Sequence, residues 1–210
     1  IQTSPSMSDK DEEICRATED RNKPPSRATT LVLSAATFAA AVARLSLGPL
    51  LPMIAVALNF SKSDQALLLS AYSTGYTLSQ IGGGLLADRY GALCVLITSC
   101  GFSAGILLLL AFSLTSVYAW NWSFWALGVA AGPLYPVCQV AVAGHAQSLA
   151  TIDAAAYLGA TVASLAPVIG DYAAFYLISA ILLISVMVAS RYTTNTMPNH
   201  AHKRENSGYG

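Results

Sequence analysis

Charged residues are scarce in this 210-residue chain, and the few that it has are unevenly placed. Asp, Glu, Lys and Arg make up 10% of the residues, against about a quarter in soluble domains. Of the 11 basic and 11 acidic residues, seven lie between residues 28 and 190. A soluble domain of that size carries many more charges on its surface. The scarcity excludes a soluble globular protein and indicates an integral membrane protein.

The sequence also lacks the patterns of metal sites, nucleic-acid binding and hydrolytic enzymes. Its four cysteines, Cys15, Cys94, Cys100 and Cys138, have neither paired nor zinc-like spacing, which excludes a disulfide framework. The net charge of zero gives no reason to expect a nucleic-acid partner. His-Glu-x-x-His and Gly-x-Ser-x-Gly motifs are missing, and no acid pair falls within an apolar segment. We therefore expect no enzyme, no metal and no cofactor.

Long apolar runs dominate the middle of the chain. Each is near or above the roughly 20 residues that a helix needs to cross about 30 Å of hydrocarbon. None alternates apolar and polar residues as the strands of a barrel do. The sequence predicts an all-α membrane protein with six transmembrane helices, the first of them kinked by Pro49 and Pro52. The six segments are Leu31–Leu58, Ala66–Ala87, Ala92–Leu114, Tyr118–Val142, Leu149–Ile169 and Tyr172–Ser190.

Polar segments flank the apolar region at both ends. Residues 1–29 and 191–210 are predicted to be disordered tails, and residues 30–190 form the six-helix transmembrane domain. Nothing in the first tail selects an organelle, so the plasma membrane and an organelle membrane both remain open. If the N-terminus is cytoplasmic, Lys62 lies outside and nine basic residues lie inside, which predicts two cytoplasmic termini. The nine are Lys10, Arg16, Arg21, Lys23, Arg27, Arg89, Arg191, Lys203 and Arg204.

The stretch "SQIGGGLLADRYGA", residues 79–92, places three glycines beside an Asp-Arg pair. It does not fit a dinucleotide-binding loop, because apolar residues rather than a strand and turn precede the glycines. Glycines 82–84 are expected to let a neighbouring helix approach closely. Asp88 is expected to cap the following helix, and Gly91 to permit a tight reversal.

These residues resemble the signature Gly-x-x-x-Asp-Arg-x-Gly of the major facilitator superfamily, through Gly84, Asp88, Arg89 and Gly91. The signature falls between the second and third helices, as in that family. The resemblance implies a gating latch that breaks and reforms during transport. The family usually has basic residues after the last glycine, where this chain has "AL".

Within that superfamily, the second helix is most similar to the anion:cation symporter family, which includes sialin, vesicular glutamate transporters and plant plastid phosphate transporters. The shared features are Gly75-Tyr76, Gln80-Ile81 and the glycine run. In the fourth helix Ala131 stands where that family carries an acid. If proton coupling in that family depends on this acid, the present chain lacks the coupling residue and would be a facilitator, an exchanger or inactive.

Members of the superfamily normally have twelve helices in two six-helix halves. The resemblance therefore implies that this chain is the N-terminal half. Three explanations stay open: a fragment of a longer protein, a half-transporter that dimerises with a second copy, or a degenerate copy.

Arg44 is the charged residue most clearly placed within an apolar segment. A charge at that depth costs about 2.5–3.5 kcal/mol, so the side chain should face a cavity or a partner. A guanidinium can bind a carboxylate or phosphate through two hydrogen bonds, but it can also be structural, bonded to carbonyls or tyrosines. The resemblance favours substrate binding, because the symporter family commonly carries an Arg in its first helix for the anion.

Further polar residues are candidates for the same site. Tyr72, Tyr76 and Gln80 share one face of the second helix, either lining a cavity or bonding a neighbouring helix. Tyr135 lies beside a proline-induced kink in the fourth helix. Asp153 either caps the fifth helix or binds a proton. The three tryptophans at residues 120, 122 and 125 are interpreted as anchors at the membrane interface.

Taken together, the sequence predicts a secondary active transporter for a small organic anion or inorganic phosphate. H⁺ or Na⁺ would be the coupling ion. Its partners would be the lipid bilayer and either the missing half or a second copy. The alternatives are a sugar-phosphate antiporter of the same superfamily and a non-transporting membrane interaction protein.

Overall fold

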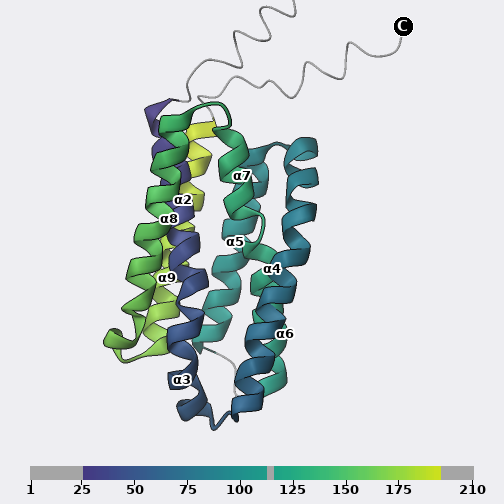
Figure 1. The fold of residues 1–210 in the computed structure, drawn as a ribbon, viewed down its shortest axis with the longest axis vertical. Coiled ribbons are helices and arrows are strands. Elements are labelled where there is room, and N and C mark those ends of the chain that lie inside the picture. Colours follow the sequence, from purple (N-terminus) through teal and green to yellow (C-terminus); the bar gives the residue numbers. More distant parts are fainter. Residues whose placement is uncertain (1–25, 113–115, 195–210) are drawn as a thin grey trace, which may run out of the picture.

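A computed structural model of the chain describes residues 26–112 and 116–194, and within these residues all regular elements are helices (Figure 1). They form six long helical rods in chain order, three of which are interrupted. The rods are α2 (Arg27–Leu45) with α3 (Leu47–Leu58), α4 (Lys62–Tyr90), α5 (Ala92–Phe112), α6 (Val117–Ala131) with α7 (Leu134–Ala141), α8 (Ala146–Ser164) with the 3-10 helix η1 (Ala166–Ile169), and α9 (Tyr172–Thr194).

Helix ends are set by polar caps and by left-handed residues. The Oγ of Ser26 accepts a hydrogen bond from the backbone N–H of Thr29 at the start of α2. Ser61 and Asp64 cap each other reciprocally at the start of α4. The chain reverses between α4 and α5 at Gly91, whose φ of 88° suits glycine and few other residues. This reversal confirms the tight turn predicted at Gly91.

Prolines account for two interruptions. The first rod changes from α2 to α3 at Ser46, shortly before Pro49 and Pro52, which lack the N–H that a continuous helix would use. The fourth rod is interrupted at Gly132 and Pro133, between α6 and α7. The predicted kinks therefore lie close to the prolines that were expected to cause them.

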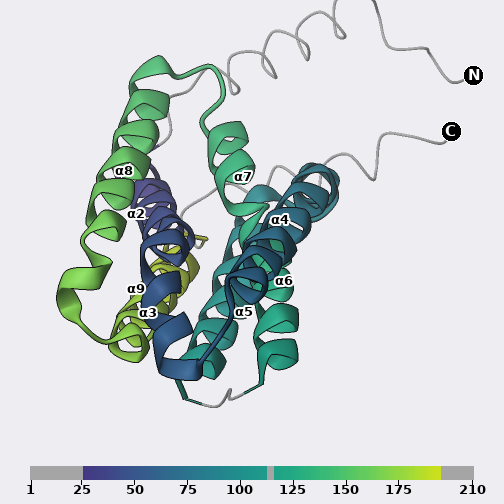
Figure 2. The same cartoon turned by 60° about the horizontal axis from the view of Figure 1, so that its bottom comes forward.

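Each rod packs most extensively against a rod that is distant in the sequence. The main pairs are α2 with α8, α4 with α6, and α5 with α9. Figures 1 and 2 show the result: α2, α3, α8 and α9 lie on one side, and α4, α5, α6 and α7 on the other. The described chain begins and ends at the same end of the bundle (Figure 1).

An aromatic cluster around Trp120 fills the core near the start of α6. Trp120 is fully buried and contacts the rings of Phe60, Phe124, Tyr172 and Tyr176. The interpretation of Trp120 as an interfacial anchor is therefore wrong, because its ring has no surface to offer to lipid. The neighbouring tryptophans at residues 122 and 125 remain exposed.

Four stretches of the described chain are long and apolar enough to cross a membrane: Arg27–Leu58, Ala92–Phe112, Val117–Ala141 and Tyr172–Tyr192. They match four of the six predicted segments. The other two, α4 and α8, are helical as predicted but more polar. Their polar side chains include those that line the central cavity described below, which is where polar groups in membrane helices are usually placed.

The predicted tails fall almost entirely outside the described residues. Residues 1–25 and 195–210 are not described, nor is the predicted end of the third segment at residues 113–115. The described helices reach slightly beyond the predicted domain boundaries of 30 and 190, since α2 begins at Arg27 and α9 ends at Thr194.

Candidate functional site

Arg44, in the last turn of α2, interacts with Tyr76 of α4 in two ways. Its Nη1 donates a hydrogen bond of 2.7 Å to the Tyr76 hydroxyl, and its guanidinium carbon lies 4.2 Å from the centroid of the Tyr76 ring. The side chain of Arg44 remains exposed. Tyr76 therefore orients the guanidinium, while other N–H groups of Arg44 stay available to a ligand.

Arg44 lines a cavity of about 240 Å³ between the two sides of the bundle. Its walls come from α2, α4, α6, α7 and α8, so the cavity depends on packing between helices that are far apart in sequence. Half of the twelve lining residues are apolar, and five of these six are alanines. The polar and charged members are Thr37, Arg44, Tyr76, Tyr135, Asp153 and Tyr157.

Asp153 lies on the α8 wall of this cavity. It is about two turns inside α8, which begins at Ala146, so the expectation that it caps this helix is wrong. The Tyr135 hydroxyl donates a hydrogen bond of 2.8 Å to Oδ1 of Asp153. The capping interpretation failed because Asp153 lies beyond the first turn of α8, where the backbone N–H groups already bond to carbonyls of the helix itself.

The other predicted site residues fall at different distances from the cavity. Tyr135 and Tyr76 both line it. Tyr72 is buried behind Tyr76, its ring stacked at 6.0 Å, and its hydroxyl has no hydrogen-bond partner among the described residues. Gln80 is half-buried on α4 and does not line the cavity. Of the three polar residues predicted to share this face of α4, Tyr76 is therefore the one that lines the cavity.

Thr37 and Tyr157 line the cavity but were not singled out from the sequence. Thr37 lies seven residues before Arg44, and Tyr157 lies four residues after Asp153. These are the spacings at which side chains share a helix face. Helical spacing from the two charged residues would have identified both positions.

The hairpin between α4 and α5 carries the predicted gating motif. A Cβ at Gly83 would come within 2.6 Å of Pro133, whereas Cβ atoms at Gly82 and Gly84 would meet open space. Close helix approach therefore depends on Gly83 alone among the three. In the described residues Asp88 forms no hydrogen bond to the start of α5, so its predicted capping role is wrong; it lies in the last turn of α4.

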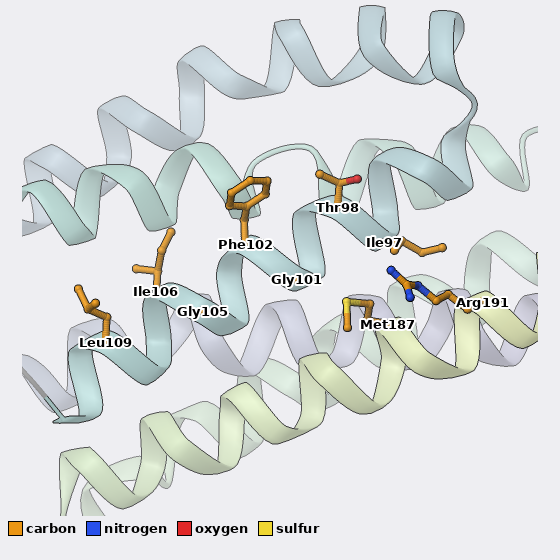
Figure 3. A pocket seen from close by; sticks show the side chains of 9 residues that line it. All are labelled: Ile97, Thr98, Gly101, Phe102, Gly105, Ile106, Leu109, Met187 and Arg191. Atoms are coloured by element: carbon orange, nitrogen blue, oxygen red, sulfur yellow. The ribbon is translucent and has the colours of Figure 1, made fainter.

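A larger hollow of about 500 Å³ lies away from this site, along the outer side of α5 and α9 (Figure 3). Its lining is apolar apart from Thr98 and Arg191, and the hollow is widened by Gly101 and Gly105. Figure 3 places Arg191 at one end of the groove. A hollow with this apolar lining suits hydrocarbon better than a charged solute.

The described residues contain no group of three or more His, Cys, Asp or Glu side chains that could hold a metal ion. Comparison with known proteins gives one clear result. The family model described as Major Facilitator Superfamily matches residues 33–208, which is most of the chain. No curated protein matches the sequence of the chain.

Proposed function

Because the chain belongs to the major facilitator superfamily, whose members are membrane transporters, we propose that it takes part in secondary active transport of a small organic anion or inorganic phosphate. The helical architecture and the apolar rods fit a multi-pass integral membrane protein. The proposal concerns the substrate class and the residues that bind it.

The observation that carries the proposal is the position of Arg44. Its guanidinium lines an internal cavity, is oriented by Tyr76, and has no ion pair with an acid among the described residues. A structural arginine would have its donors occupied by carbonyls or tyrosines, whereas Arg44 bonds one tyrosine through Nη1 and makes no other hydrogen bond among the described residues. An exposed guanidinium in a small cavity instead favours a carboxylate or phosphate, which it can bind through two parallel hydrogen bonds.

The proposal extends to the organisation of the transporter. The chain would supply the N-terminal half, with six spans and both ends in the cytoplasm, and the cavity would be completed by a second half or a second copy. Asp88 and Arg89 would form the gate on the cytoplasmic side. The similarity of the α4 sequence supports placement in the anion:cation symporter family. Arg44 would serve a sugar phosphate equally well, so a sugar-phosphate antiporter is the second candidate.

Anion binding to the purified chain tests the substrate class. Calorimetric titration with inorganic phosphate and with L-lactate should give saturable binding of at least one of them. Substitution Arg44→Gln should weaken that binding about 10- to 150-fold, since a hydrogen bond to a charged group contributes about 1.5–3 kcal/mol. The anion affinity of Arg44→Lys should fall between those of the wild type and Arg44→Gln, because an ammonium keeps the charge and loses the two-point geometry.

Lys62→Gln is the matched control. It removes a cation from the first residue of α4, outside the cavity, and should leave the affinity unchanged. The proposal is wrong if the wild type binds neither anion, or if Arg44→Gln binds as tightly as the wild type. Uptake of the bound anion into liposomes containing the chain then tests transport itself.

A further inference from the structure

The cavity holds two opposite charges that do not pair. Arg44 donates to Tyr76, and Asp153 accepts from Tyr135. Both side chains line the same 240 Å³ space, yet no ion pair joins them in the described part of the chain. Opposite charges inside a membrane protein usually pair with each other. Here each is held on its own wall by a tyrosine, and the space between them is left for a third group.

An anion bound to Arg44 in this space lies close to Asp153. An aspartate side chain is ordinarily ionised at neutral pH. Two negative charges in a small cavity disfavour one another, and protonation of one of them relieves the repulsion. The cavity geometry therefore links occupation by an anion to the protonation of Asp153.

Few other groups can share this proton. The elements packed against α8 are α2, α7 and η1. They contribute Arg44 and Tyr135 to the cavity, and η1 contains no titratable residue. Tyr76 lines the cavity from α4, and Tyr157 lines it from α8 itself. Arginine and tyrosine keep their protons at neutral pH, so among the described cavity residues Asp153 is the group suited to gain one.

We propose that Asp153 is the proton-binding residue of the cavity, so that an anion at Arg44 and a proton at Asp153 bind cooperatively. The step is simple: a proton from water is transferred to a carboxylate oxygen of Asp153, and no covalent bond to the anion forms. Tyr135 is a positioning residue, which stabilises the unprotonated carboxylate by donating its hydroxyl hydrogen. The inference rests on the proposed anion site and adds the coupling ion to it.

Calorimetric titration of the chain with phosphate and lactate at several pH values from about 3.5 to 8, a range that includes the ordinary titration of an aspartate, tests this coupling. Each titration is repeated in two buffers of different ionisation enthalpy, which gives the protons taken up per bound anion. Comparison with Asp153→Asn cancels any proton that the anion itself gains. At pH 7.5 the variant should bind about tenfold more tightly than the wild type, and the difference should shrink as the pH falls and the free protein itself takes up the proton.

A tenfold change corresponds to about half a proton per anion at the midpoint of the transition, and this uptake should be missing in Asp153→Asn. Tyr135→Phe keeps the ring and removes the donor, so the midpoint should move to higher pH. The Tyr135→Phe variant also tests the inference if Asp153→Asn does not fold. Asp171→Asn, an acid outside the cavity that caps α9, is the matched control and should titrate as the wild type does.

Three results overturn the inference. Asp153→Asn could keep the proton uptake of the wild type. It could lose anion binding at every pH, which would make Asp153 a ligand of the substrate. The anion affinity could depend on Na⁺ instead of pH. If the wild type binds no anion at all, the proposed function fails too; if it binds through Arg44 without proton uptake, only the coupling fails.

Discussion

Ser61 and Asp64 form the most complete cap among the described helices. Ser61 donates to Oδ2 of Asp64 through its hydroxyl at 2.7 Å and its backbone N–H at 2.9 Å, and these bonds hold the pKa of Asp64 below its ordinary value near 3.8. Asp64 lies ahead of the predicted apolar segment, in the first turn of α4. The cap therefore fixes where α4 begins and how the chain enters it.

This cap should make stability depend on pH at the acidic end. A carboxyl whose pKa is lowered by folding stabilises the folded state above its unfolded pKa, and that contribution is lost as the pH falls through the folded value. Asp64→Asn should lower the melting temperature in detergent at pH 7. The difference from the wild type should shrink as the pH falls below the ordinary value near 3.8 and the carboxylate becomes protonated in the folded protein. A difference that persists at low pH would contradict the hydrogen-bonded carboxylate.

At the scale of single residues, the sequence singled out several side chains that line the cavity, while their role in binding stays a prediction. Arg44, Tyr76 and Tyr135 were identified because polar groups in apolar helices are costly and need a purpose. For Asp153 the sequence left a helix cap and a proton site open, and the cap was wrong. Asp153 lies about two turns inside α8, on the wall of the cavity that Tyr135 and Arg44 also line, and the packing that brings these helices together is not visible in the sequence.

Among the helical elements, the packing pattern has an internal symmetry. The first rod packs on the fifth, the fourth on the second, and the third on the sixth. Exchanging the first three rods with the last three maps this set of pairs onto itself. Such exchange is the arrangement expected of two inverted three-helix repeats. Glycines occupy the matching contacts, with Gly75 of α4 against Trp125 and Gly159 of α8 against Phe38.

The α4–α6 pair should be the contact most sensitive to side-chain size. A Cβ at Gly128 would collide with the Tyr72 carbonyl oxygen and approach the backbone nitrogen of Tyr76 to 2.8 Å. Backbone atoms cannot yield without separating the helices. Gly128→Ala should therefore destabilise the fold by about 1–3 kcal/mol, measured by thermal or denaturant unfolding in detergent.

Gly82→Ala is the comparison for this substitution, since a Cβ there meets nothing within 4 Å. It should be neutral or slightly stabilising, because alanine restricts the unfolded chain. Equal destabilisation by both variants would mean that loss of glycine flexibility, and not helix spacing, determines the effect. The sequence predicted close packing at glycines 82–84, but which glycine faces a neighbour depends on helix rotation, which composition does not reveal.

For the whole molecule, hydropathy predicted the number and order of the rods, while their partners were beyond its reach. Apolar length marks each rod independently. Pairing depends on small residues and side-chain shape across contacts more than a hundred residues apart, such as the 3.5 Å approach of the Thr37 hydroxyl to the Ile152 carbonyl. The aromatic core around Trp120 was missed for the same reason, because tryptophan at a helix end suits both a lipid interface and a core.

The predicted orientation can be tested by labelling. After replacement of the four native cysteines by serine, Ser63→Cys places a thiol in the first turn of α4, and Gln147→Cys places one in the first turn of α8. A membrane-impermeant maleimide should label Ser63→Cys in intact cells and Gln147→Cys only after permeabilisation, because the basic residues favour the cytoplasmic side. The reverse pattern would place both termini outside.

The pairing of α2 with α8 also has a consequence for biogenesis. Thr37 and Ile152 are 115 residues apart, and ribosomes add about 5–20 residues per second, so α2 waits roughly 6–23 s for its main partner. During that interval Arg44 is inside or beside the translocation channel without its final surroundings. Tyr76 follows 32 residues after Arg44 and is synthesised far sooner. The Tyr76 hydroxyl would then first accept a hydrogen bond from Arg44 during synthesis, which would help to retain α2 in the membrane before α8 is made.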